Sequence, residues 1–196
     1  MISLSDLDDV DMRDAKKGQF YMTDPHRSIA NNSAVYEMQP TNTELMDEWV
    51  ALMKSGSGER GIFNRGSLAV TLPKRRTEYF KKLGFIGEDG VVHGSIGTNP
   101  CAEIILQSKQ FCNLSEVIAR AHDTEASLVR KARLASIIGT YQSTLTKFGY
   151  ISKEWTEHNK AERLLGVSIT GQWDSPAARR SEVMVKVRDM AIKTNI

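Results

Sequence analysis

The sequence predicts an α/β fold with parallel strand pairing, because short apolar segments alternate with longer amphipathic ones along the chain. The clearest short segments are residues 34–36 and 164–171, which are rich in apolar and β-branched side chains. The clearest long segment is 124–148, where apolar residues recur every three or four positions, as on one face of a helix.

The composition is that of a globular domain with no strong electrostatic preference. The chain has 196 residues, of which 40% are hydrophobic and 26% charged, and its formal net charge is +2. Such a balance gives no general attraction to nucleic acid or to a membrane surface. No apolar run approaches the roughly 20 residues of a membrane span, and the acidic N-terminus lacks the pattern of a signal peptide. We therefore expect a cytoplasmic protein.

In the first half of the chain, capping and turn residues predict where elements begin and end. Ser5 and Asp8 have the spacing of a helix cap, Thr41 and Glu44 form a capping box, and Pro73 suits the first turn of a basic helix. The expected elements are a helix over 5–17, an extended stretch over 19–22, a strand within 29–38, a helix from 41 to a stop at 55–58, a short apolar element at 61–64 and a helix over 73–83.

In the second half, glycines between 84 and 98 predict a loop, with a hairpin around 91–92. The expected elements after it are a strand over 103–106, a helical pattern from 113–116, a helix over 124–148, a strand over 164–171 and a final helix from Pro176 to about Thr194. Two of the helices should bury an apolar stripe. The stripes are Leu45, Trp49, Leu52 and Met53 in one, and Leu134, Ile138, Tyr141, Leu145 and Phe148 in the other.

One loop brings together chemically useful side chains: Asn99, Cys101 and Glu103 occupy alternate positions after a glycine-rich stretch. In an extended segment, residues two apart face the same way, so a thiol, a carboxylate base and an amide would share one face. The alternative is a structural cysteine after a proline turn, with Glu103 on the surface. The spacing alone leaves both open.

The string Asn-Pro-Cys-Ala-Glu at 99–103 resembles the active-site finger loop of ribonucleotide reductases, whose signature is Asn-Pro-Cys-x-Glu. Asn99, Cys101 and Glu103 match this signature, and Ala102 stands where many relatives have Gly.

The segment Phe-Cys-Asn-Leu at 111–114 resembles the element that carries one of the family's two reducing cysteines, here Cys112. The short separation from Cys101 resembles the adenosylcobalamin-dependent class, in particular the monomeric ribonucleoside-triphosphate type. The strings RSIANNSAVYE, GERGIFNR and RLLGVSITGQWD resemble stretches that flank the finger loop in the same order.

The resemblance implies radical-based reduction of ribonucleotides to 2′-deoxyribonucleotides for DNA synthesis. Cys101 would carry a thiyl radical generated with adenosylcobalamin and abstract the 3′ hydrogen. Glu103 would take the proton of the 3′ hydroxyl, Asn99 would hold the ribose hydroxyls, and Cys112 would supply reducing equivalents as half of a redox-active disulfide.

The resemblance also implies that residues 1–196 are the central part of a ten-stranded α/β barrel, with the finger loop at about 96–104 and the N- and C-terminal parts of the barrel absent. The expected partners are the ribonucleotide, complementary N- and C-terminal reductase pieces and a thioredoxin-like reductant. No metal site, direct nucleic-acid contact or membrane contact is expected. A split gene or an excised piece would both explain such a slice, and the chain alone should be inactive and poorly soluble.

Two rival functions remain at this point. The chain could be an inactive fragment that acts as an interaction or regulatory piece on a complete reductase. It could also be a thiol hydrolase that pairs Cys101 with His93 or His122, although no third orienting group is evident.

Overall fold

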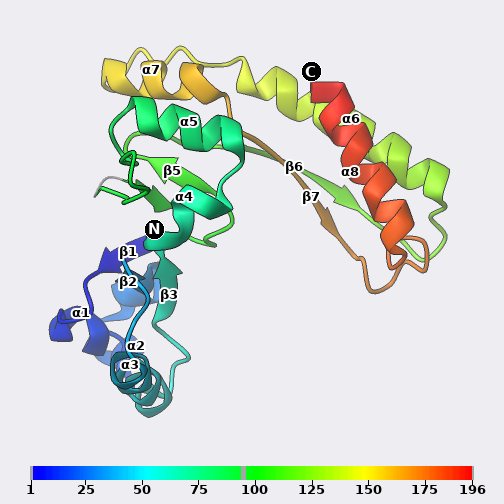
Figure 1. Cartoon of the computed structure of the whole chain (residues 1–196). Coiled ribbons are helices and arrows are strands. Elements are labelled where there is room, and N and C mark those ends of the chain that lie inside the picture. Colours follow the sequence, from blue (N-terminus) through cyan, green and yellow to red (C-terminus); the bar gives the residue numbers. More distant parts are fainter. Residues whose placement is uncertain (1, 94–95, 196) are drawn as a thin grey trace. The chain divides into compact units, whose positions relative to one another are not determined.

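The computed structural model describes residues 2–93 and 96–195, which divide into unit 1, Met1–Ser108, and unit 2, Lys109–Ile196. Helices alternate with short strands in both units, so the predicted α/β class is confirmed (Figure 1). The strands of the described residues form small parallel and antiparallel sheets and do not close into a barrel. Among these residues, no helix is long and apolar enough to cross a membrane.

Unit 1 holds a three-stranded parallel sheet in the order β1-β2-β3 and an antiparallel pair, β4-β5. Its elements are β1 (Ile2–Ser5), α1 (Val10–Asp14), α2 (Phe20–Thr23), η1 (Pro25–Ile29), β2 (Asn31–Tyr36), α3 (Asn42–Ser55), β3 (Gly61–Asn64), η2 (Arg65–Ser67), α4 (Leu68–Thr71), α5 (Lys74–Lys82), β4 (Ile96–Thr98) and β5 (Ile105–Gln107). The core joins the sheet to α4, α5 and β4 through Val35, Phe63, Leu68, Phe80, Ile86, Val92 and Ile96.

Two ionic contacts, one buried and one partly exposed, connect segments of unit 1 that are far apart in the sequence. The Arg60 guanidinium donates to both carboxylate oxygens of Glu48 on α3, at 2.8 and 2.9 Å, and to the Ser5 hydroxyl at the end of β1, at 2.7 Å. The adjacent Glu59 accepts a hydrogen bond from the buried Lys16 ammonium at 2.7 Å. Two-pronged charged hydrogen bonds of this kind offset the desolvation of the buried charges.

Unit 2 consists of β6 (Asn113–Ile118), α6 (Glu125–Ser143), α7 (Lys153–Glu162), β7 (Leu165–Thr170) and α8 (Ser181–Asn195). β6 and β7 pair in parallel along their whole length. Helix α6 packs over both strands, and α8 packs beside α6 (Figure 1). This is the crossover that the alternating sequence pattern predicts.

The prediction that the large apolar residues form the buried face of α6 is wrong. Leu134, Ile138 and Tyr141 are 50, 62 and 72% exposed. The face packed on the strands and α8 carries small residues apart from Leu128, and its buried members are Leu128, Ala132, Ala135, Ser136, Gly139 and Ser143. A Cβ on Gly139 would lie 2.2 Å from Leu165 Cδ1, so the Leu165 side chain would have to move to admit it.

The apolar face of α3 is also largely exposed. Thr41 and Glu44 form the predicted capping box, and Gly56 ends the helix in a left-handed conformation. However, Trp49 and Met53 are 50 and 61% exposed. The capping prediction is therefore confirmed and the predicted burial is wrong.

Several predicted boundaries are also wrong. Ser5 ends β1, and α1 is capped instead by Asp9, whose side chain accepts a hydrogen bond from the Met12 N–H at 2.9 Å. The segment from 113 has polar residues suited to a helix start, but it pairs with β7 as a strand, so tertiary pairing overrides the local preference. Other differences are α2 in place of an extended stretch, an end of α6 at Ser143 instead of 148, the unpredicted helix α7 and a final helix that begins at Ser181. Of the hairpin predicted around residues 91–92, the structure has one antiparallel bridge, between Ile86 and Val92.

The turn from β6 into α6 depends on one carboxylate. Asp123 accepts hydrogen bonds from the Lys131 ammonium (2.6 Å), the Ser127 hydroxyl (2.6 Å) and the Arg120 N–H (2.7 Å). The hydrogen bond from Lys131, followed by that from Ser127, lowers the pKa of Asp123 from 3.8 to about 2. The ionised form is therefore the one that stabilises the turn.

We predict that Leu128→Ala lowers the free energy of unfolding by about 2–5 kcal/mol, because it leaves a cavity in a fully buried site. Ile138→Ala on the same helix should change it by less than about 0.5 kcal/mol, because that side chain is mostly exposed. Urea unfolding of the two variants checks this. A larger loss for Ile138→Ala would support the orientation expected from the apolar stripe instead.

We also predict an acid-dependent loss of stability that comes from Asp123. Its pKa is lower in the folded chain than in the unfolded chain, so its contribution is complete above about pH 4 and is lost as the pH falls toward 2. Asp123→Asn should flatten this part of the stability curve. Unfolding measured from pH 5 to pH 2 gives the comparison, and parallel curves for the two proteins would contradict the assignment.

Candidate active site

The Asn99–Glu103 segment forms the tip of the antiparallel hairpin made by β4 and β5. The strands pair with Thr98 opposite Ile105, so residues 99–104 form the connecting loop. At its base, the Asn99 N–H donates to the Ile104 carbonyl at 3.3 Å. The predicted finger loop of 96–104 thus corresponds to β4 and this connection.

The loop is a tight turn, so the prediction of an extended segment is wrong. The Ala102 N–H donates to the Asn99 carbonyl at 3.0 Å, which closes a four-residue turn. Asn is favoured at the first position of such turns and Pro at the second. Ala102 at the fourth position has φ +64°, where glycine is favoured. The turn places Cys101 at its third position.

The turn brings Asn99 and Glu103 into direct contact. Asn99 Nδ2 donates to Glu103 Oε1 at 2.5 Å, and Asn99 Oδ1 accepts from the Ile104 N–H at 3.2 Å. In an extended strand, residues four apart are about 13 Å apart, so the contact exists only because the chain turns. The Asn99 amide therefore orients the carboxylate as well as closing the loop.

The thiol of Cys101 lies on the part of the loop between these two groups and is exposed. Glu103 is exposed as well. The structure thus joins the side chains of Asn99 and Glu103. The proline turn and the surface position of Glu103 are those of the alternative that the spacing left open, but Cys101 is exposed as well.

Two supports of the hairpin were missed by sequence reasoning. The Asn31 amide at the start of β2 donates to the Pro100 carbonyl, and the Gln107 amide donates to the Tyr79 hydroxyl of α5 at 3.0 Å. The consecutive asparagines at 31 and 32, next to an apolar strand, were a possible signal for the first. No local pattern indicates the second.

Cys112 belongs to unit 2, where it immediately precedes β6 and is half-buried. Cys101 belongs to unit 1. Both cysteines are thiols in the structure, so a redox role for Cys112 stays a prediction.

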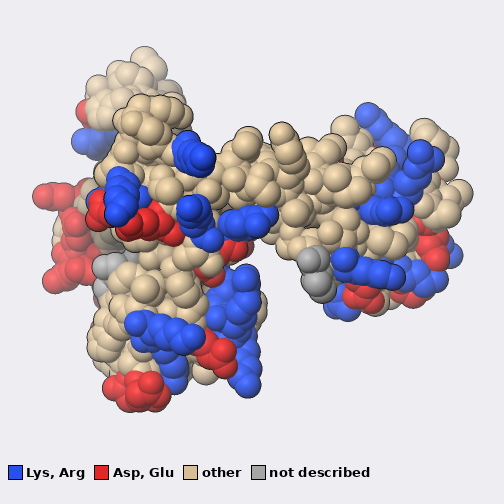
Figure 2. All heavy atoms as spheres, turned by 90° about the horizontal axis from the view of Figure 1, so that it is seen from above, with Lys and Arg blue, Asp and Glu red and all other residues tan. Residues whose placement is uncertain are grey.

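The histidines give no support to a hydrolase. His93 and His122 are both exposed, and among the described residues no hydrogen bond joins either of them to Cys101. The described residues also contain no group of three or more His, Cys, Asp or Glu side chains that could hold a metal ion. Acidic and basic side chains lie near one another on the face shown in Figure 2, in keeping with the small net charge.

Comparisons of the chain with protein-family models, with curated proteins and with solved structures found no match.

We predict that Ala102→Gly does not destabilise the chain, because glycine removes the cost of a left-handed conformation, about 1–2 kcal/mol for other residues. The same change at Ala126, an exposed position of α6, should cost about 0.5–1 kcal/mol. Urea unfolding of both variants is the measurement. Equal losses at the two positions would contradict the turn at 99–102.

Proposed function

We propose that this chain supplies the thiyl-radical loop of an adenosylcobalamin-dependent ribonucleotide reductase that acts on ribonucleoside triphosphates. The observation that carries the proposal is the turn at 99–102, which leaves Cys101 exposed in a loop where Asn99 donates a hydrogen bond to the Glu103 carboxylate at 2.5 Å. The resemblance of this string to the reductase finger loop gives these residue types their roles.

In this proposal, Cys101 as a thiyl radical takes the 3′ hydrogen of the ribose and becomes a thiol. Glu103 accepts the proton of the 3′ hydroxyl as the 2′ hydroxyl leaves as water. The Asn99 amide keeps the carboxylate in position, so its role includes positioning Glu103 as well as holding ribose hydroxyls. Cys112, with a second thiol from another polypeptide, supplies two electrons and two protons and ends as a disulfide.

The described residues do not fit a complete site for the cobalamin. Asn31, which donates a hydrogen bond to the finger loop, also lines a cavity of about 450 Å³. This cavity is lined by α1, η1 and the starts of β1 and β2. This volume is too small for a corrin ring with its nucleotide arm. Other polypeptides would have to hold the cofactor, whose function is to generate the radical.

The described residues expose large apolar side chains such as Trp49, Ile138 and Tyr141, at 50, 62 and 72%, and their strands form small sheets that do not close. Exposed apolar side chains favour association with other polypeptides. We propose that complementary N- and C-terminal pieces complete a ten-stranded barrel.

The test is ribonucleotide reduction by this chain mixed with the complementary N- and C-terminal polypeptides, adenosylcobalamin and a dithiol. Cys101→Ala should abolish deoxynucleotide formation, and Glu103→Gln should lower it by about 10²- to 10⁴-fold. Cys112→Ala is the matched cysteine control. It should stop deoxynucleotide formation but leave tritium release from 3′-tritiated substrate, because that step needs only Cys101.

Retention of activity by Cys101→Ala would refute the radical role. Confirmed assembly without activity in the unmodified chain would instead favour an inactive fragment that acts as an interaction or regulatory piece.

A further inference from the structure

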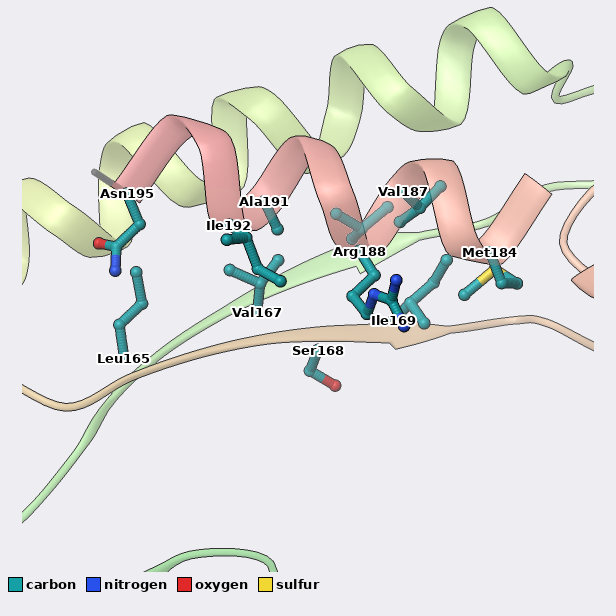
Figure 3. A pocket seen from close by; sticks show the side chains of 11 residues that line it. Leu165, Val167, Ser168, Ile169, Met184, Val187, Arg188, Ala191, Ile192 and Asn195 are labelled. Carbon is teal, nitrogen blue, oxygen red and sulfur yellow. The ribbon is translucent and has the colours of Figure 1, made fainter. Parts of the chain in front are cut away.

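Helix α8 lines two cavities with different faces. Figure 3 shows the face beside β7, where Ile192 lines a groove together with residues of the strand. Met190 and Lys193 line a second cavity, of about 510 Å³, together with Arg133 and Ile137 of α6. The described lining of this second cavity comes from the two helices alone.

Polar contacts near both ends of the helix pair fix the spacing of α6 and α8. Near their starts, the Lys186 ammonium donates to the Glu125 carboxylate at 2.6 Å. Near their ends, the Thr140 hydroxyl donates to Asn195 Oδ1 at 2.7 Å. The second cavity lies between these two contacts along α6, so its backbone frame is set before any ligand binds.

Two cations without a partner line this cavity. Among the described residues, the side chains of Arg133 and Lys193 make no hydrogen bond or ion pair, and the described lining contains no acidic side chain. In the adjoining cavity, which shares Lys193, the Lys186 ammonium is instead neutralised by Glu125. The second cavity therefore gathers positive charge that an anion can balance.

The rest of the lining is mainly apolar. Ile137 is 47% exposed, and Met190 is partly buried opposite it on α8. The Thr194 hydroxyl donates to the Met190 carbonyl at 2.7 Å, so its proton is already used. A methionine thioether packs well against carbon groups and aromatic rings. The cavity thus suits an anionic group that carries an apolar part.

We propose that this cavity binds an organic phosphate monoester, with the phosphate between Arg133 and Lys193 and the carbon part against Ile137 and Met190. A guanidinium can hold two phosphate oxygens at once, and an ammonium adds a second charge. A phosphate monoester is close to dianionic at neutral pH, because its second pKa is about 6, whereas a carboxylate has a single charge. The proposal does not depend on the proposed function.

The probe is phenyl phosphate, titrated into the isotope-labelled full chain and followed by amide resonances. Inorganic phosphate tests the charge without the carbon part, and benzoate tests a ring with a single charge. Phenyl phosphate should shift the resonances of residues 133–137 and 190–194. It should bind at least about fivefold more tightly than either comparison compound, because it alone uses both the cations and the apolar wall.

Charge-removing variants test the two cations. Arg133→Gln and Lys193→Gln should each weaken phenyl phosphate binding by about tenfold. Lys160→Gln is the matched control, because Lys160 is in the last turn of α7 as Lys193 is in the last turn of α8, and both are exposed. It removes the same charge and the same interaction with a helix end, so binding should not change, while urea unfolding should respond equally in both lysine variants.

Two adjacent isoleucines test the apolar wall. Ile137→Ser should remove the preference for phenyl phosphate over inorganic phosphate. Ile138→Ser should keep it, because Ile138 is similarly exposed, 62% against 47%, but does not line the cavity.

The proposal is overturned if saturating phenyl phosphate shifts resonances elsewhere but not at 133–137 and 190–194. Benzoate binding as tight as that of phenyl phosphate would assign the cavity to carboxylates and also overturn it. An equal loss of binding in Lys160→Gln and Lys193→Gln would reduce the effect to the net charge of the chain, with the same consequence. These measurements need neither reductase activity nor complementary polypeptides, so the proposed function is judged separately.

Discussion

The consecutive residues Glu59 and Arg60 are the constraint on which unit 1 depends. Arg60 joins α3 to the end of β1 through Glu48 and Ser5. The Glu59 carboxylate accepts the backbone N–H of Asn32 at 3.2 Å, at the start of β2. Removing one partner of such a buried pair is costly because the other charge stays buried without compensation.

The same constraint extends to the candidate site. The residue before Asn32 is Asn31, whose amide donates to the Pro100 carbonyl in the hairpin loop. The position of the loop thus follows from the position of β2. The loop itself is closed by local contacts between Asn99, Ala102 and Glu103. A short turn needs both kinds of support, because it has little buried surface of its own.

The sequence identified the residues of the candidate site and left open two geometries, an extended segment and a proline turn, of which the structure shows the turn. Asn99, Cys101 and Glu103 could be selected from their chemistry and spacing, whereas the turn depends on Pro100 and on a left-handed Ala102. The turn residues Asn and Pro at 99 and 100 were a usable signal for that geometry. The anchor at Asn31 is distant in sequence, and no spacing within the loop could reveal it.

The fold was predictable where local chemistry decides it, as in the capping box at Thr41 and Glu44. It was not predictable where two patterns compete. Helix α6 has both a stripe of large apolar residues and a stripe of small ones with the same period, and only the close approach to Leu165 shows that the small stripe is inside. The segment at 113 has polar helix-start residues, but pairing with β7 makes it a strand.

The small-residue face of α6 has a consequence for how this helix can change during evolution. Ala132 is fully buried in the core of unit 2, and a side chain on Gly139 would displace Leu165, so larger residues at these positions would overpack the core. Ile138 and Tyr141 are exposed, so this restriction does not apply to them. The least variable positions of α6 should therefore be its small buried residues, whereas the bulky exposed ones can be exchanged without disturbing the core of unit 2.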